Sequence, residues 1–188
     1  REYERLIDYA LEIGITNAFI YRPVAVYASD VNGDGITELP RAVLMAGYKD
    51  TSSSDAVYML DWYAYGIGKV PAKVAATYQN ISDAWSLLID QKWHDRITAI
   101  KANDGGLSYV EFFEYRKNKM SIPLFNIYCA TGSNREYYAE RTDLIQLGQT
   151  TQAIYFAKLT NEGEQSELAL TGDEIKARFS LVNQAWNN

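Results

Sequence analysis

The segment that decides the fold is residues 96–130, RITAIKANDGGLSYVEFFEYRKNKMSIPLFNIYCA. It is rich in β-branched and aromatic residues, and we predict strands at 96–100, 107–116 and 121–130. The residues 103–106, Asn-Asp-Gly-Gly, are typical of a hairpin turn because asparagine, aspartate and glycine tolerate positive φ. The basic run 116–119 is interpreted as a second turn. The segment therefore predicts three consecutive strands that pair in antiparallel fashion.

Further strands are predicted on both sides of this segment. They are expected at residues 24–28, 39–45, 56–65, 70–78, 144–148 and 152–159. Pro40 lies at the start of the second of these, which suits an edge strand or a first position because proline cannot donate a ladder hydrogen bond. Residues 84–89 fit a short helix or a strand, and a turn is expected at 90–93.

Two amphipathic helices are predicted to flank these strands. Residues 2–13 place apolar side chains on one face at helical spacing. Near the other end Thr171 can cap a helix, Glu174 follows three residues later, and the apolar face comprises Ile175, Phe179, Val182 and Trp186. The sequence therefore predicts an α+β fold, mainly antiparallel sheet with an N-terminal and a C-terminal helix. We expect a single domain over residues 1–188, with a possible division into two subdomains near residue 80.

Composition narrows the function classes. The net charge of −6 argues against nucleic acid as a partner, because phosphate binding needs a concentrated basic surface. Cys129 is the one cysteine, so no internal disulfide forms, and no apolar run approaches the roughly 20 residues of a membrane-spanning helix. The chain opens at Arg1 without methionine. We interpret it as a mature or trimmed piece whose signal peptide or anchor cysteine would lie outside it.

Residues 30–38, DVNGDGITE, have the spacing of a calcium-binding loop. Side chains of Asp30, Asn32, Asp34 and Glu38 occupy positions 1, 3, 5 and 9, and Ile36 can offer its backbone carbonyl from position 7. An EF-hand needs a glutamate at position 12, where this chain has Arg41, so an EF-hand is excluded. The alternative is a turn that binds no metal, since aspartate, asparagine and glycine form turns unaided.

This loop resembles the strand–loop–strand calcium motifs of FG-GAP repeats and one half of dockerin-type loops. The resemblance implies a structural Ca²⁺ held by Asp30, Asn32, Asp34, Ile36 and Glu38. It differs in having asparagine at position 3 and glutamate at position 9, and tandem copies are absent.

More broadly the chain resembles uncharacterised exported surface lipoproteins of Gram-positive, often gut, bacteria. The features that carry this resemblance are the 30–38 loop, a Trp-rich run over residues 84–98 and the closing segment over residues 170–186. It implies an extracellular, cell-surface protein that is lipid-anchored at full length, with no assigned reaction.

No catalytic set is evident. Cys129 and His94 are single members of their kinds, and a Cys–His nucleophile would need both. Glu111 and Glu114 are expected on opposite faces of one strand, which is poor geometry for joint acid–base chemistry. A second set of acids, which could act with a distant acid on a glycoside, comprises Glu136, Glu140 and Asp143.

Tyrosines offer a binding surface instead. In residues 56–65 one face of the predicted strand carries Met59, Asp61, Tyr63 and Tyr65, which would stack on sugars or contact a protein if exposed. Ordinary sheet packing is the alternative. We therefore expect a non-enzymatic exported domain with a structural calcium loop and a binding or structural role at the cell surface. Its ligand would be carbohydrate or protein, and membrane contact would come only through an anchor outside this chain. The alternatives are a carboxylate-based polysaccharide hydrolase and a Tyr-rich protein-interaction module.

Overall fold

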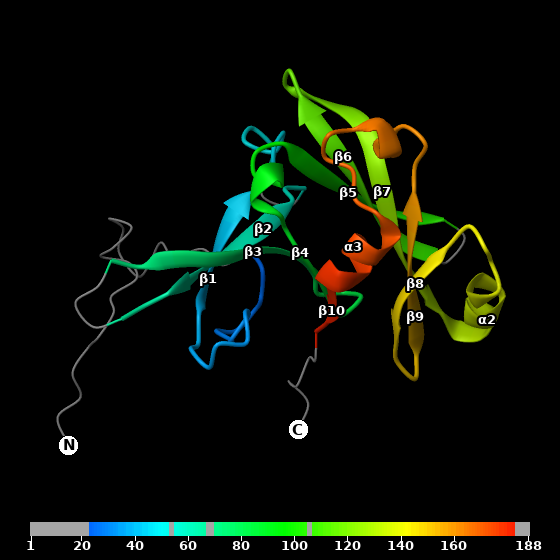
Figure 1. Ribbon diagram of the computed structural model, residues 1–188, viewed down its shortest axis with the longest axis horizontal. Coiled ribbons are helices and arrows are strands. Elements are labelled where there is room, and N and C mark those ends of the chain that lie inside the picture. The colour runs from blue at the N-terminus through cyan, green and yellow to red at the C-terminus, as the bar shows by residue number, and fades with distance from the viewer. Residues whose placement is uncertain (1–22, 53–54, 67–69, 105–106, 183–188) are drawn as a thin grey trace.

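The computed structural model describes residues 23–52, 55–66, 70–104 and 107–182, which form two five-stranded antiparallel sheets (Figure 1). The first sheet has the order β1-β2-β3-β4-β10, and the second has the order β5-β6-β7-β9-β8. The strands of the first sheet are β1 (Leu39–Leu44), β2 (Tyr58–Ala64), β3 (Ala72–Asn80), β4 (Trp85–Leu88) and β10 (Phe179–Leu181). Those of the second are β5 (Ile97–Asp104), β6 (Leu107–Arg116), β7 (Lys119–Thr131), β8 (Ile145–Gln149) and β9 (Ala153–Leu159).

The meander predicted for residues 96–130 is confirmed. Strand β6 pairs with β5 on one side and with β7 on the other, both in antiparallel register. The β6–β7 turn places Lys117 and Asn118 at φ of 49° and 60°, the left-handed conformation that a two-residue hairpin requires. The predicted pair at 144–148 and 152–159 is also confirmed as β8 and β9.

The prediction of an α+β fold with two amphipathic helices is wrong, because the chain is mostly antiparallel sheet. Two α-helices are described, α2 (Arg135–Ala139) and α3 (Gly172–Arg178). The cap of α3 is as predicted: Thr171 and Glu174 form a capping box. The helix ends at Arg178, however, and the backbone becomes extended at Phe179. The helix predicted for residues 2–13 lies outside the described residues.

The early end of α3 has a tertiary cause. Strand β4 is short and would have a free edge, and Phe179 and Leu181 pair with Leu87 and Trp85 to cover it. The Phe179 ring then lies 5.9 Å from the ring of Trp85 in the core. Sheet pairing therefore outweighs the helical spacing of the apolar residues.

The remaining strand predictions have different outcomes. Residues 84–89, which fitted either structure, contain strand β4. The strand predicted at 24–28 is absent: the Val26 N–H donates to the carbonyl of Val24, a turn-type bond, and a single bridge joins Ser29 to Glu38. The strands predicted at 39–45, 56–65 and 70–78 are confirmed as β1, β2 and β3, and Pro40 lies on the edge strand β1 as expected.

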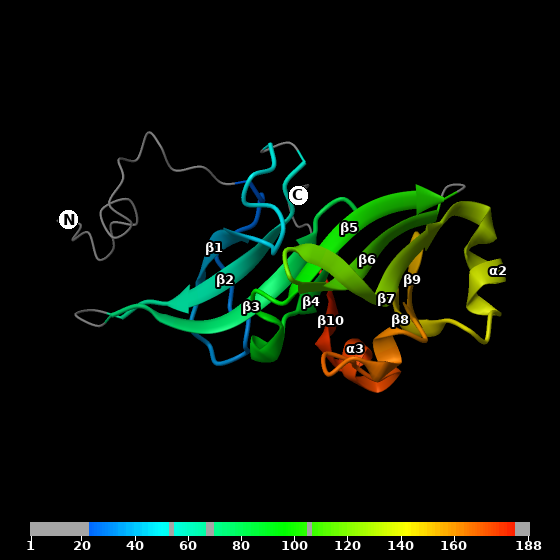
Figure 2. The ribbon, with the colours of Figure 1, turned by 90° about the horizontal axis from the view of Figure 1, so that it is seen from above.

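The two sheets lie next to each other (Figures 1 and 2). Both contribute to one cluster of buried side chains. Tyr78 of β3 meets Phe112 of β6 edge to face at 5.3 Å, and Tyr155 of β9 lies 5.5 Å from Phe179 of β10. The chain passes from the first sheet to the second between Leu88 and Ile97, after β4. Whether the sheets unfold as one domain stays a prediction. None of the described helices has the length and apolar character needed to cross a membrane.

Candidate functional site

The 30–38 loop is closed at its base by backbone hydrogen bonds. The Ser29 N–H donates to the carbonyl of Glu38 at 3.1 Å, and the Glu38 N–H returns the bond at 3.0 Å. Within the loop Gly33 and Gly35 adopt φ of 78° and 83°, which favours glycine at both positions. The chain therefore makes a tight reversal immediately before strand β1.

The carboxylate of Asp30 organises this reversal. It accepts N–H donation from Gly33 at 2.7 Å, from Asp34 at 3.2 Å and from Gly35 at 2.8 Å. These backbone donors, with Gly35 first, lower the pKa of Asp30, while slight desolvation opposes them. Asp30 is thus held ionised over the centre of the loop.

Asn32 and Asp34 each form a turn in which the side chain accepts the backbone N–H of the residue two positions later. The Asp34 N–H donates to Asn32 Oδ1 at 3.0 Å, and the Ile36 N–H donates to Asp34 Oδ1 at 2.8 Å. Asn32 Nδ2 also donates to Asp34 Oδ2 at 2.9 Å. Ile36 itself is half exposed and would contribute only its backbone carbonyl.

Glu38 is the unusual member of the set, since its side chain is fully buried. Its Oε2 accepts the Val31 N–H at 2.9 Å, so the carboxylate reaches back to the start of the loop. Its Oε1 is buried and has no hydrogen-bond partner, and no described cation pairs with the group. A buried carboxylate without a counter-charge is costly.

The donor chemistry fits a hard cation in part. All five predicted ligands offer oxygen, and Glu38 Oε1 is an acceptor in need of a partner. Across the described residues, however, no three histidine, cysteine, aspartate or glutamate side chains gather closely enough to hold a metal ion. Binding would therefore have to draw the carboxylates of Asp30, Asp34 and Glu38 closer together.

The single thiol and the single imidazole belong to different environments. Cys129 lies on β7 in the core, where desolvation and then the charge of Asp83 raise the pKa of its thiol to about 11. His94 lies beyond β4, with Nδ1 3.2 Å from Asp95 and Nε2 3.8 Å from Asp61. A thiol with this pKa is a poor nucleophile at neutral pH.

The carboxylates considered for glycoside chemistry have other partners or positions. Glu114 faces the core with Phe112, whereas Glu111 is half-buried on the other face of β6. Asp143 accepts both Nε and Nη2 of Arg141 and pairs with Lys158 at 3.1 Å. These cations hold the pKa of Asp143 well below its usual range. A general acid must carry a proton at the working pH, so Asp143 is poorly suited to that role.

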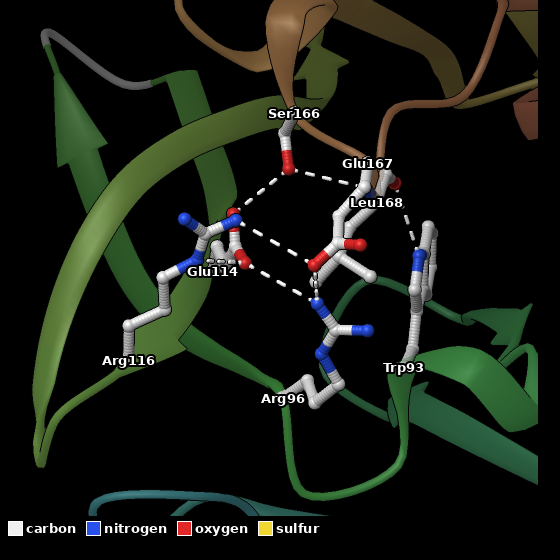
Figure 3. Close-up of polar contacts among 7 residues, drawn as sticks. All are labelled: Trp93, Arg96, Glu114, Arg116, Ser166, Glu167 and Leu168. Atoms are coloured by element: carbon white, nitrogen blue, oxygen red, sulfur yellow. Dashed lines mark hydrogen bonds and ion pairs between the residues drawn. The ribbon is translucent and has the colours of Figure 1, made fainter.

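The fully buried Glu114 is the centre of an ionic cluster that reaches the surface (Figure 3). Its Oε2 accepts the Ser166 hydroxyl at 2.8 Å, and its Oε1 accepts Arg116 Nε, with Arg96 Nη2 3.7 Å away. Glu167 bridges the two guanidinium groups from the exposed side. We call these five residues the Glu114 cluster. It fixes the 160s segment to β6, so its role is structural.

Strand β2 shows why the Tyr-rich face of residues 56–65 is not an open surface. Met59 and Asp61 are buried on one face, and Leu60 and Trp62 are buried on the other. Tyr63 is half-buried. Ordinary packing accounts for this strand.

The structure brings together a different aromatic group, which the sequence did not indicate. On the outer face of the second sheet, Tyr109 of β6, Tyr128 of β7 and Phe156 of β9 occupy one cross-strand row. Beside it lies a cavity of about 170 Å³. The cavity is lined by Leu107, Tyr128, Tyr138, Arg141, Leu144, Phe156 and Lys158. Its residues come from four separate parts of the chain, so no local motif marks it.

Comparison with family models, curated proteins and solved structures finds no match to this chain.

Proposed function

We propose that this is a non-enzymatic binding domain that works outside the cell, with the 30–38 loop stabilised by one Ca²⁺. Asp30, Asn32, Asp34 and Glu38 would supply side-chain oxygens, and Ile36 its carbonyl. The observation that carries the proposal is the buried carboxylate of Glu38, whose Oε1 has no partner among the described groups. A cation beside it would offset the cost of burying that charge.

The proposed location follows from the ligand set. With three carboxylates and no acid at position 12, the loop has fewer charged ligands than a high-affinity site. Calcium sites of extracellular modules bind in the range of about 10⁻⁴–10⁻³ M, far more weakly than cytosolic sites. A weak site is useful only where calcium is abundant, which favours an exported domain at the cell surface.

A binding role is favoured over catalysis by the surroundings of the reactive side chains. The thiol is buried, Glu111 and Glu114 lie on opposite faces of a strand, and Asp143 is held by arginine and lysine. A surface cavity with aromatic and basic side chains is present instead on the second sheet.

Thermal unfolding in calcium and in chelator tests the ion. At a calcium concentration about 100 times Kd, linkage adds about 2.7 kcal/mol to the free energy of unfolding. For a chain of this length that gain raises Tm by roughly 5–10 °C. Magnesium at the same concentration should give a smaller shift, because it demands a tighter octahedral site.

Asp34→Asn is the matched variant, because an amide oxygen can still accept the Ile36 N–H while the charge is lost. The calcium-dependent rise in Tm should shrink in this variant. Glu164→Gln removes an exposed acid elsewhere and should leave the rise intact. A Tm that is the same in calcium and in chelator for the unaltered protein would overturn the proposal.

A further inference from the structure

We propose that the cavity on the outer face of the second sheet binds a single carboxylated sugar ring, a uronic acid. This names the ligand class for the binding role proposed above and rests on that role. It does not depend on calcium, because the 30–38 loop adjoins β1 in the first sheet whereas the cavity lies beside α2. These elements are well separated in both ribbon views, with β1 on the left and α2 at the right-hand end (Figures 1 and 2).

Two tyrosines provide the walls. Tyr128 of β7 is half-buried, and Asn126 Nδ2 donates to its hydroxyl at 2.9 Å, so the ring is held in place. Tyr138 of α2 faces the same cavity, next to the exposed Tyr137. Aromatic rings pack well against the C–H face of a sugar, and their hydroxyls can bond to sugar hydroxyls.

The charged groups select an anion. Arg141 and Lys158 both line the cavity, and both pair with one carboxylate, that of Asp143. Among these three residues the charges sum to +1, and Asn126 separates Lys158 from the acid of its cross-strand row, Glu111. Asp143 occupies two of the five N–H groups of the guanidinium, and one contact of the ammonium, so donors remain for a ligand carboxylate.

The size of the cavity limits the ligand. Its volume of about 170 Å³ is below the roughly 300–1,000 Å³ of sites for drug-sized molecules. One six-membered ring with its carboxylate is therefore the appropriate unit, and a polysaccharide would present it as a terminal or side-chain residue. The cross-strand row of Glu111, Asn126 and Lys158 adds polar groups beside the aromatic row, as recognition of hydroxyls requires.

The test is an NMR titration of the whole chain in calcium-containing buffer. Sodium glucuronate should give saturable amide shifts at the cavity residues, with Kd in the millimolar range expected for a ligand of this size. Its methyl ester, which keeps the ring and loses the charge, should bind at least about tenfold more weakly. Glucose should behave like the ester.

Variants identify the site. Lys158→Met keeps most of the side-chain volume and should weaken glucuronate binding by about tenfold, as loss of a charged hydrogen bond predicts. Lys101→Met, on the exposed surface of β5, is the control and should bind as the unaltered protein does. The dispersion of the NMR spectrum shows whether each variant is folded. The comparison of glucuronate, its methyl ester and glucose uses the unaltered protein, so it remains a test even if a variant does not fold.

Several results would overturn the inference. They are an absence of saturable shifts with glucuronate, equal affinity for glucuronate and its ester, or tighter binding of benzoate than of glucuronate, which would indicate an aromatic acid. Failure here is distinct from failure of the calcium proposal. A protein whose Tm is the same in calcium and in chelator can still show the glucuronate shifts, and a protein stabilised by calcium can lack them.

Discussion

Loss of the Glu114 carboxylate is expected to destabilise the protein strongly. Glu114→Ala would remove the acceptor of the buried Ser166 hydroxyl and of Arg116 Nε, and would leave the exposed Glu167 as the carboxylate paired with the two guanidinium groups. Because both guanidinium groups are half exposed and stay paired, the loss should come mainly from the buried Ser166 hydroxyl left without its charged partner, at about 2–3 kcal/mol. Urea denaturation measures the change.

Glu167→Ala is the matched control for Glu114→Ala, because it removes the exposed acid of the same cluster. The Glu167 side chain is 64% exposed, so its ion pairs should contribute no more than about 1 kcal/mol. Equal losses for the two variants would contradict the assignment of Glu114 as the centre of the cluster.

Glu111 and Asp143 should respond to pH in opposite directions. Burial raises the pKa of Glu111, so its charged form disfavours folding. The cost is absent below the pKa of the unfolded state, where the group is protonated in both states, and grows as pH rises through the folded-state pKa. Glu111→Gln should therefore raise Tm at pH 7 and leave Tm unchanged at pH 3.

For Asp143 the effect of pH on stability has the opposite sign, because Arg141 and then Lys158 lower the pKa of its carboxyl. Its contribution is present above the pKa of the unfolded state and is lost as pH falls toward the folded-state value. Asp143→Asn should lower Tm at pH 7, with a smaller loss in acid. The measurement is Tm across pH 3–7, and parallel curves for the two variants would contradict both assignments.

At the level of elements, the capping box of α3 should contribute measurably to the free energy of unfolding. Thr171 Oγ1 accepts the Glu174 N–H at 3.2 Å, and Glu174 accepts the Thr171 N–H at 2.8 Å. Thr171→Ala should lower the free energy of unfolding by about 1 kcal/mol, and Thr171→Ser should retain most of it. Chemical denaturation tests this, and equal stability of the two variants would show that the hydroxyl does not cap the helix.

Elements whose signals are local were predictable from sequence, and elements decided by distant partners were not. The β6–β7 turn and the start of α3 depend on residues within a few positions of each other, such as Asn118 and Thr171. The end of α3 depends on the free edge of β4, far away in the chain. Residues 24–28 have β-forming side chains, but none of the described strands pairs with them.

The same division applies to the candidate sites. The oxygen ligands of the 30–38 loop lie within nine residues, so their spacing alone points to calcium. The Glu114–Ser166 bond joins residues 52 positions apart, and the aromatic cavity draws on β6, β7, α2 and β9. Those groups meet only in the folded chain, and the spacing of their residues in the sequence does not indicate that they will.

For the molecule as a whole, the shared core predicts a single unfolding transition. Phe112 touches Tyr78 of the first sheet and stacks on Phe125 of the second at 4.8 Å. Phe112→Ala should cost about 3–5 kcal/mol and lower one common transition. Calorimetry that resolves two transitions, only one of them shifted, would instead indicate two subdomains.

The calcium proposal is tested most directly by Glu38→Gln, measured in chelator and in calcium. The substitution keeps the oxygen that accepts the Val31 N–H and removes the buried charge. In chelator the variant should be at least as stable as the unaltered protein, because an uncompensated buried carboxylate is gone. In calcium the unaltered protein should gain stability by linkage, and the variant should gain little. A variant less stable in chelator, or a calcium gain equal in both proteins, would contradict the assignment of Glu38 as a ligand.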